Sequence, residues 1–136
     1  MRSAVTLCLL ALVLSACGSS TPRDSAEDFS GAERAVADAV EAMETAARDD
    51  EPAELCTKLL SERLLAALKA QGTNCTTAAR EAFDDASSKD LTVKDVSIDG
   101  NTATVKVTSG SGSDEKEDTL ELEKAAGGWK ISSLRS

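Results

Sequence analysis

The spacing of apolar residues changes once along this chain, near Leu91, and this change constrains the fold more than any other feature. Before Leu91, apolar residues recur at steps of three and four, as on the buried face of an α-helix. After it they alternate with polar residues, as in strands that bury one face. The sequence therefore predicts an α+β domain whose N-terminal helices pack on a curved four-stranded antiparallel sheet.

Helix signals divide the first half of this domain into units that cover residues 30–48, 52–70 and 76–86. Pro52 begins the second unit, Ser61 is a further cap signal inside it, and Gly72 ends it. Residues 52–70 are therefore two short helices or one bent helix. Thr76 or Thr77 is the expected cap of the last helix.

The second half is expected to be an antiparallel meander. A turn centred on Gly100-Asn101 predicts a hairpin that joins apolar residues across two strands. The pairs that this register sets are Val96 with Val105 and Ile98 with Ala103. Leu91 and Val93 have the opposite parity, so a β-bulge is expected near Lys94-Asp95.

The last two strands follow a Gly/Ser loop over residues 109–114. A turn over residues 125–128 places Leu122 opposite Ile131. Trp129 shares the parity of Ile131, so its ring is expected to be buried between sheet and helices.

The N-terminus resembles a bacterial lipoprotein signal. Residues 1–16 combine a basic start, an apolar segment too short to span a bilayer and a small-residue end. The following Cys17 completes a lipobox-like tetrapeptide, Leu14-Ser15-Ala16-Cys17. The sequence thus predicts a lipid-anchored protein at the extracytoplasmic face of the cell membrane, with acyl chains on Cys17; ordinary cleavage that leaves a free thiol is the alternative. Residues 17–28 are expected to be a flexible tether and residues 29–136 one domain.

Two cysteines remain in the domain after removal of the signal and lipidation of Cys17. Cys56 and Cys75 form an even pair in an exported chain, which favours a structural disulfide over reactive or unpaired thiols. Their spacing fits no metal motif, and we expect neither a metal nor a cofactor.

Composition excludes several functions. The chain has no His, no Tyr and a formal net charge of −9. It therefore has no histidine metal centre or Ser-His-Asp triad, and an acidic surface opposes binding of a nucleic-acid backbone.

The sheet residues also carry a family resemblance. The segments Val96–Val107, Leu120–Lys124 and Gly128–Ser132 resemble the C-terminal half of nuclear-transport-factor-2-like lipoproteins, most nearly the lumazine-binding-like or uncharacterised ones of actinobacteria. The resemblance implies a cone-shaped roll with a cavity between sheet and helices, and often a homodimer. Superfamily isomerases and cyclases use cavity Asp, His or Tyr residues. Since this chain has no His or Tyr, no catalytic residue is carried over.

Four charged residues are candidates for the cavity. Lys116 and Asp118 share the parity of Leu120 and either line a pocket mouth or are solvated, the second being favoured. Asp84 and Asp85 lie on the polar side of their helix, so a buried general base there is disfavoured. Two hypotheses follow: a module that binds an apolar small molecule or a protein, which we favour, and an isomerase- or cyclase-type enzyme that uses a cavity carboxylate. An open cavity with an inward carboxylate would favour the second.

Overall fold

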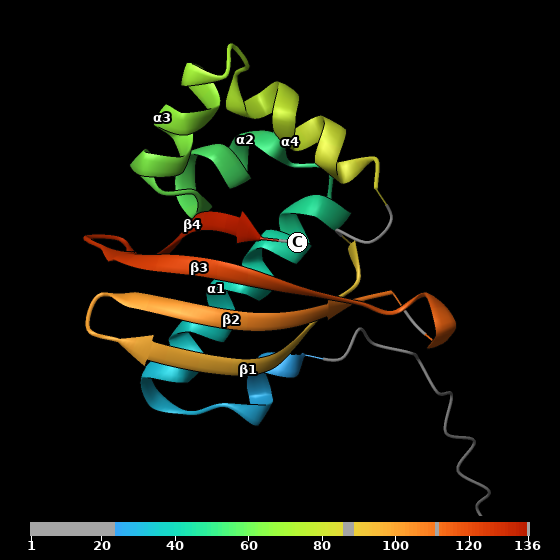
Figure 1. Ribbon diagram of the computed structural model, residues 1–136, viewed down its shortest axis with the longest axis vertical. Coiled ribbons are helices and arrows are strands. Elements are labelled where there is room, and N and C mark those ends of the chain that lie inside the picture. Colours follow the sequence, from blue (N-terminus) through green and yellow to red (C-terminus); the bar gives the residue numbers. More distant parts are fainter. Residues whose placement is uncertain (1–23, 86–88, 111, 136) are drawn as a thin grey trace, which may run out of the picture.

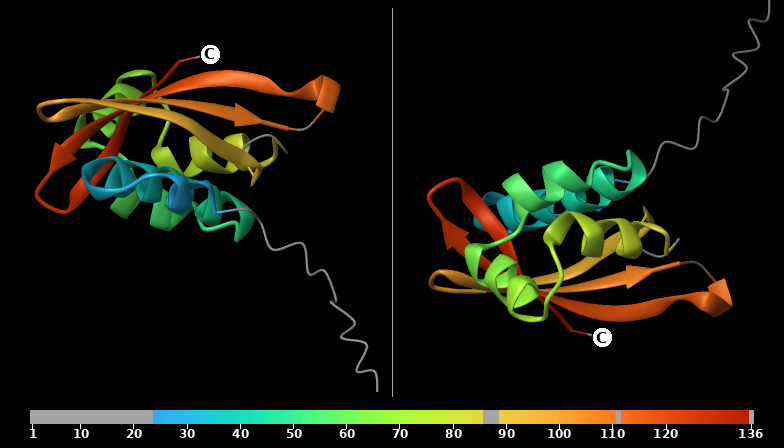
Figure 2. Two further views of the ribbon diagram at one scale, coloured as in Figure 1. Left: turned by 90° about the horizontal axis from the view of Figure 1, so that it is seen from below. Right: turned by 90° about the horizontal axis from the view of Figure 1, so that it is seen from above.

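The structure, a computed structural model, describes residues 24–85, 89–110 and 112–135. Its sheet has the strand order β1-β2-β3-β4, with every neighbouring pair antiparallel. The strands are β1 (Leu91–Asp99), β2 (Thr102–Ser109), β3 (Lys116–Ala125) and β4 (Gly128–Arg135), with a short 3-10 turn, η4 (Gly112–Asp114), before β3. Helices and sheet form two layers (Figure 2). The predicted α+β architecture is confirmed.

The helical layer has one long helix and several short ones. The long helix, α1 (Gly31–Arg48), contacts both outer strands, β1 and β4. The short helices gather beyond β4 in Figure 1. They are α2 (Pro52–Glu54), the π-helical turn η2 (Leu55–Leu59), α3 (Glu62–Ala70) and α4 (Cys75–Phe83).

The sheet register agrees with the prediction. Val96 pairs with Val105 and Ile98 with Ala103, and Gly100 takes the positive φ of 59° that this tight turn requires. The register shifts between Val93 and Asp95, where the bulge was expected. Leu122 pairs with Ile131 across β3 and β4.

This register puts the apolar residues of all four strands on the face that α1 covers. Val36 and Val40 of α1 pack into one core with the buried residues of the sheet, which include Val105, Leu122 and Ile131. These side chains are almost completely removed from water. The burial of the strand side chains that alternate along the sheet therefore holds the two layers together.

Residues 52–70 form two units, one of the two arrangements expected. The Ser61 hydroxyl accepts the backbone N–H of Leu64 and begins α3, while the Ser61 N–H donates to the Ile131 carbonyl at 2.9 Å. The break between the units is thus attached to β4.

Asn74, not Thr76 or Thr77, caps α4: its side-chain oxygen accepts the Thr77 N–H at 2.9 Å. The helix also ends earlier than predicted, at Phe83.

The predicted tether extends too far into the chain. Its last residues form a 3-10 turn, η1 (Ser25–Asp28), in which Ser25 and Ala26 are buried. The Ser25 hydroxyl donates to Glu41 of α1 and accepts the Val93 N–H of β1, each at 3.0 Å. This turn therefore belongs to the domain because it pairs with an N–H group of the edge strand β1. Residues 17–23 lie outside the described residues.

The expected burial of Trp129 is only partly correct. Its ring packs against the main core, but the residue is half-buried. Trp129 lies next to the β3–β4 turn and pairs with the exposed Lys124. The end of the sheet is less well covered there than its centre, which explains the remaining exposure.

The carboxyl group of Glu41 makes the stability of the N-terminal turn depend on pH. Burial is the main reason that the pKa of Glu41 lies above its usual value, and a hydrogen bond with Asp24 raises it further. The same hydrogen bond lowers the pKa of Asp24. Protonated Glu41 therefore stabilises the domain fully at pH values below the pKa that it has in the unfolded chain. This stabilisation is lost as the pH rises through the raised pKa of the folded state. We expect Glu41→Gln to be more stable than wild type at pH 7, because glutamine keeps the acceptor for Ser25 and Ala26 without the charge.

Chemical denaturation at several pH values between about 4 and 7 checks this expectation. The advantage of Glu41→Gln over wild type should grow as pH rises. Glu33→Gln, an exposed change on the same helix, is the matched control and should show no such trend. A constant difference between Glu41→Gln and wild type would contradict the role of Glu41.

Candidate functional site

A cavity of about 340 Å³ lies between the helices and one end of the sheet. Its wall is formed by α1, η2, α3, α4 and strands β1 to β3. Most of the side chains are apolar, among them Met43, Leu64, Leu68, Ala78, Phe83 and Leu120. Such a volume is at the small end of the range for ligand pockets, about 300–1,000 Å³.

Helix α3 shows why the cavity exists. Its sequence has an apolar face with Leu64, Leu65 and Leu68, yet none of its residues is buried. Leu64 and Leu68 instead line the cavity. The helix is connected to β4 through Ser61, and it borders the cavity without filling it.

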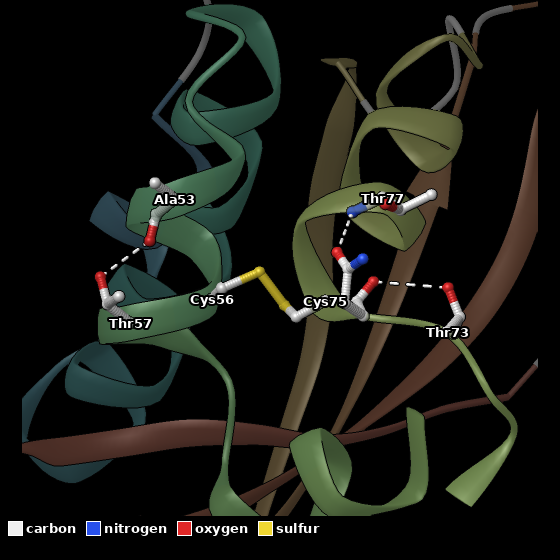
Figure 3. Close-up of a disulfide and its surroundings, with 7 residues drawn as sticks. Ala53, Cys56, Thr57, Thr73, Cys75 and Thr77 are labelled. Carbon is white, nitrogen blue, oxygen red and sulfur yellow. Dashed lines mark hydrogen bonds between the residues drawn. A yellow bond between two sulfur atoms is a disulfide. The ribbon is translucent and has the colours of Figure 1, made fainter. Parts of the chain in front are cut away.

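Figure 3 shows the covalent connection in this wall. The disulfide joins Cys56 of η2 to Cys75 at the start of α4, with a Cα–Cα distance of 5.9 Å. It confirms the pairing predicted from the sequence. Cys75 itself lines the cavity, and α3 lies within the loop that the disulfide closes. The disulfide therefore limits how far η2 and α4 can move apart within the helical wall.

Two polar side chains interrupt the apolar wall. Ser109, the last residue of β2, is only 2% exposed, and its Oγ has no hydrogen-bond partner among the described residues. Asp118 of β3 is half-buried and also lines the cavity. The two belong to adjacent strands, with Asp118 opposite Val107 and Ser109 two residues further along β2.

The structure separates the four charged candidates. Asp118 lines the cavity, contrary to the solvated position that we favoured, because the inward face of β3 continues beyond Leu120. Lys116 is exposed and is not part of the wall. Asp84 and Asp85 are exposed after the end of α4.

Ser109 was not among the expected site residues, because the local sequence assigned it to the Gly/Ser loop. The structure ends β2 at Ser109 and begins β3 at Lys116. Ser109 has the same parity along β2 as Val105 and Val107, which are both buried. This parity is the signal that could have identified Ser109 as an inward-facing residue.

Two negative findings apply to residues 24–85, 89–110 and 112–135. No three His, Cys, Asp or Glu side chains are arranged there to hold a metal ion. No helix in this part of the chain has the length and apolar character needed to cross a bilayer. The predicted signal, residues 1–16, and Cys17 lie outside the described residues.

An antiparallel sheet covered by helices, with an apolar cavity between the layers, defines an α+β roll with an internal pocket. The chain belongs to the family described as "Putative lumazine-binding", whose model matches residues 61–133. The lumazine-binding-like resemblance is thereby confirmed. No curated protein matches the chain. One solved structure, a "De novo designed NTF2 fold protein NT-9", aligns with a TM-score of 0.44 and 20% sequence identity. The alignment covers 76% of this chain and 81% of the designed chain.

Proposed function

We propose that this protein is a lipid-anchored, extracytoplasmic module that binds a small apolar ligand in its cavity. The observation that carries the proposal is the cavity of about 340 Å³, which leaves Leu64 and Leu68 of α3 incompletely buried in its wall. An apolar wall favours apolar ligands because binding removes both surfaces from water.

The family description names lumazine, but the wall of this cavity favours a less polar molecule. Lumazine is a fused heterocycle with several hydrogen-bonding ring nitrogens and carbonyl groups. Among the described residues of the wall, only Ser109 and Asp118 have oxygen-bearing side chains. Several polar atoms of lumazine would therefore face leucine, alanine and phenylalanine side chains, which costs binding free energy.

Filling the cavity is expected to abolish ligand binding. Ala78 on α4 is half-buried in the wall, so Ala78→Leu places a larger side chain in the cavity. We expect wild-type protein to increase the fluorescence of Nile red, a neutral apolar dye, and Ala78→Leu to reduce its affinity about tenfold or more.

Ala67→Leu provides the matched control, because Ala67 is exposed on α3 and does not line the cavity. It should bind the dye like wild type. Equal dye binding by both variants and wild type would contradict the cavity as the binding site.

The anchoring part of the proposal rests on the N-terminal sequence. The apolar segment ends in Leu14-Ser15-Ala16-Cys17, and acyl chains on Cys17 would provide firm membrane attachment. Cells given a fatty-acid analogue should incorporate it into wild-type protein, whereas Cys17→Ser should be unlabelled and released from the membrane fraction. Labelling of Cys17→Ser would show that the acyl chain is elsewhere.

The second candidate function is an isomerase- or cyclase-type enzyme, and the position of Asp118 in the wall favours it. A carboxylate inside an apolar cavity is suited to proton abstraction. Such a reaction also needs a donor for the developing oxyanion, for which the wall offers the Ser109 hydroxyl but no tyrosine. We therefore place binding first.

Sedimentation of the purified protein tests the homodimer that the family resemblance implies.

A further inference from the structure

The position of Ser109 and Asp118 provides a polar end to an otherwise apolar cavity. Val107 is directly opposite Asp118, and Ser109 follows Val107 on the same face of the sheet. Ser109 and Asp118 are thus diagonal neighbours, with side chains separated by about 7 Å or less. One polar group of a ligand fits between two partners at this spacing.

The Ser109 hydroxyl has unused hydrogen-bonding capacity. It can donate one hydrogen bond and accept two, but it has no partner among the described residues and is 2% exposed. A buried hydroxyl without a partner is costly, and such groups are rare in folded proteins. A ligand atom in the cavity would supply the missing partner.

Asp118 determines the polarity of that ligand atom. An ionised carboxylate only accepts hydrogen bonds, so the ligand must donate one. Among the residues that the structure describes, no lysine or arginine lines the cavity. The nearest basic residue along the strand, Lys116, is exposed and outside the wall. A carboxylate or phosphate head group would therefore meet the negative charge of Asp118 without a compensating cation.

We propose that the ligand is an apolar molecule with a hydrogen-bond-donating head group, an alcohol or an amine, bound between Ser109 and Asp118. The apolar body lies against the leucines of α3 and the side chains of α4. This inference rests on the proposed function and adds the class of ligand. It excludes fatty acids and other apolar anions as the preferred ligands.

Displacement of Nile red by compounds with one common chain tests the head group. Decanol and decylamine are the donors, and decanoate and decyl methyl ether lack a donor at neutral pH. We expect the two donors to displace the dye at concentrations about tenfold lower than the other two compounds. The ether is the control for decanol because both are uncharged.

Two variants connect this preference to the proposed residues. Asp118→Asn should reduce the preference for decylamine over decanoate about tenfold, while Asp84→Asn, which removes an exposed negative charge of the same kind, should leave it unchanged. Ser109→Ala should weaken decanol binding severalfold without lowering the melting temperature, since it removes a hydroxyl that has no partner.

The outcomes separate the two proposals. If Nile red binds and Ala78→Leu prevents it, but all four compounds displace it equally, the head-group inference is wrong and the apolar cavity stands. An unchanged amine preference in Asp118→Asn also overturns the inference. If Nile red does not bind to wild type, both proposals fail.

Discussion

Leu122→Ala is expected to lower the free energy of unfolding by about 2 to 5 kcal/mol, a large share of the roughly 5 to 15 kcal/mol typical of a domain. Leu122 is 0% exposed and lies in the main core between the sheet and α1. Its cross-strand partner on β4 is Ile131, which is also 0% exposed. Truncation leaves a cavity that close-packed neighbours cannot fill.

Leu65→Ala is the matched control for this substitution. Leu65 is half-buried on α3 and belongs neither to the core clusters nor to the cavity wall. Urea denaturation, followed through the fluorescence of the single tryptophan, measures both variants. Equal losses in the two variants would show that the core is not concentrated between α1 and the sheet.

Removal of the disulfide is expected to have the second large effect. The Cys56–Cys75 bond joins residues 19 positions apart, and a loop of this length contributes about 3 kcal/mol on the chain-entropy model. We expect the double variant Cys56→Ser, Cys75→Ser to lose about this amount. It should also bind Nile red more weakly, because α4, which lines the cavity, is no longer joined to η2 in a fixed position.

A reductant separates the effect of the bond from that of the serine side chains. Dithiothreitol should lower the unfolding midpoint of wild type to near that of the double variant and should leave the double variant unchanged. A wild-type midpoint that is the same with and without reductant, after complete reduction is verified by thiol titration, would contradict a stabilising disulfide.

The candidate site was harder to predict than the fold. Parity along β3 made Asp118 a candidate, but the same pattern also allowed it to be solvated. Ser109 was overlooked because a serine followed by glycine is typical of a loop, and because a polar residue on a buried face opposes the usual pattern. Both residues become a site only through the helices that cover this end of the sheet, and their positions depend on contacts between distant segments.

The N-terminal turn provides a similar example. Residues 25–28 have no apolar periodicity, and the sequence around them is typical of a tether. They join the domain because Ser25 accepts the Val93 N–H, a contact across 68 positions of sequence. No local pattern contains this information.

The sequence by itself determined the helical and strand halves, the hairpin register at Gly100, the bulge near Asp95, the Leu122–Ile131 pair and the cysteine pairing. These features follow from residue periodicity, turn chemistry and the number of cysteines, which are local or countable properties. The tertiary structure alone decided the Asn74 cap, the partial exposure of Trp129 and the cavity with Ser109 and Asp118 in its wall. An empty space depends on how several helices pack together, so it has no signature in any one segment.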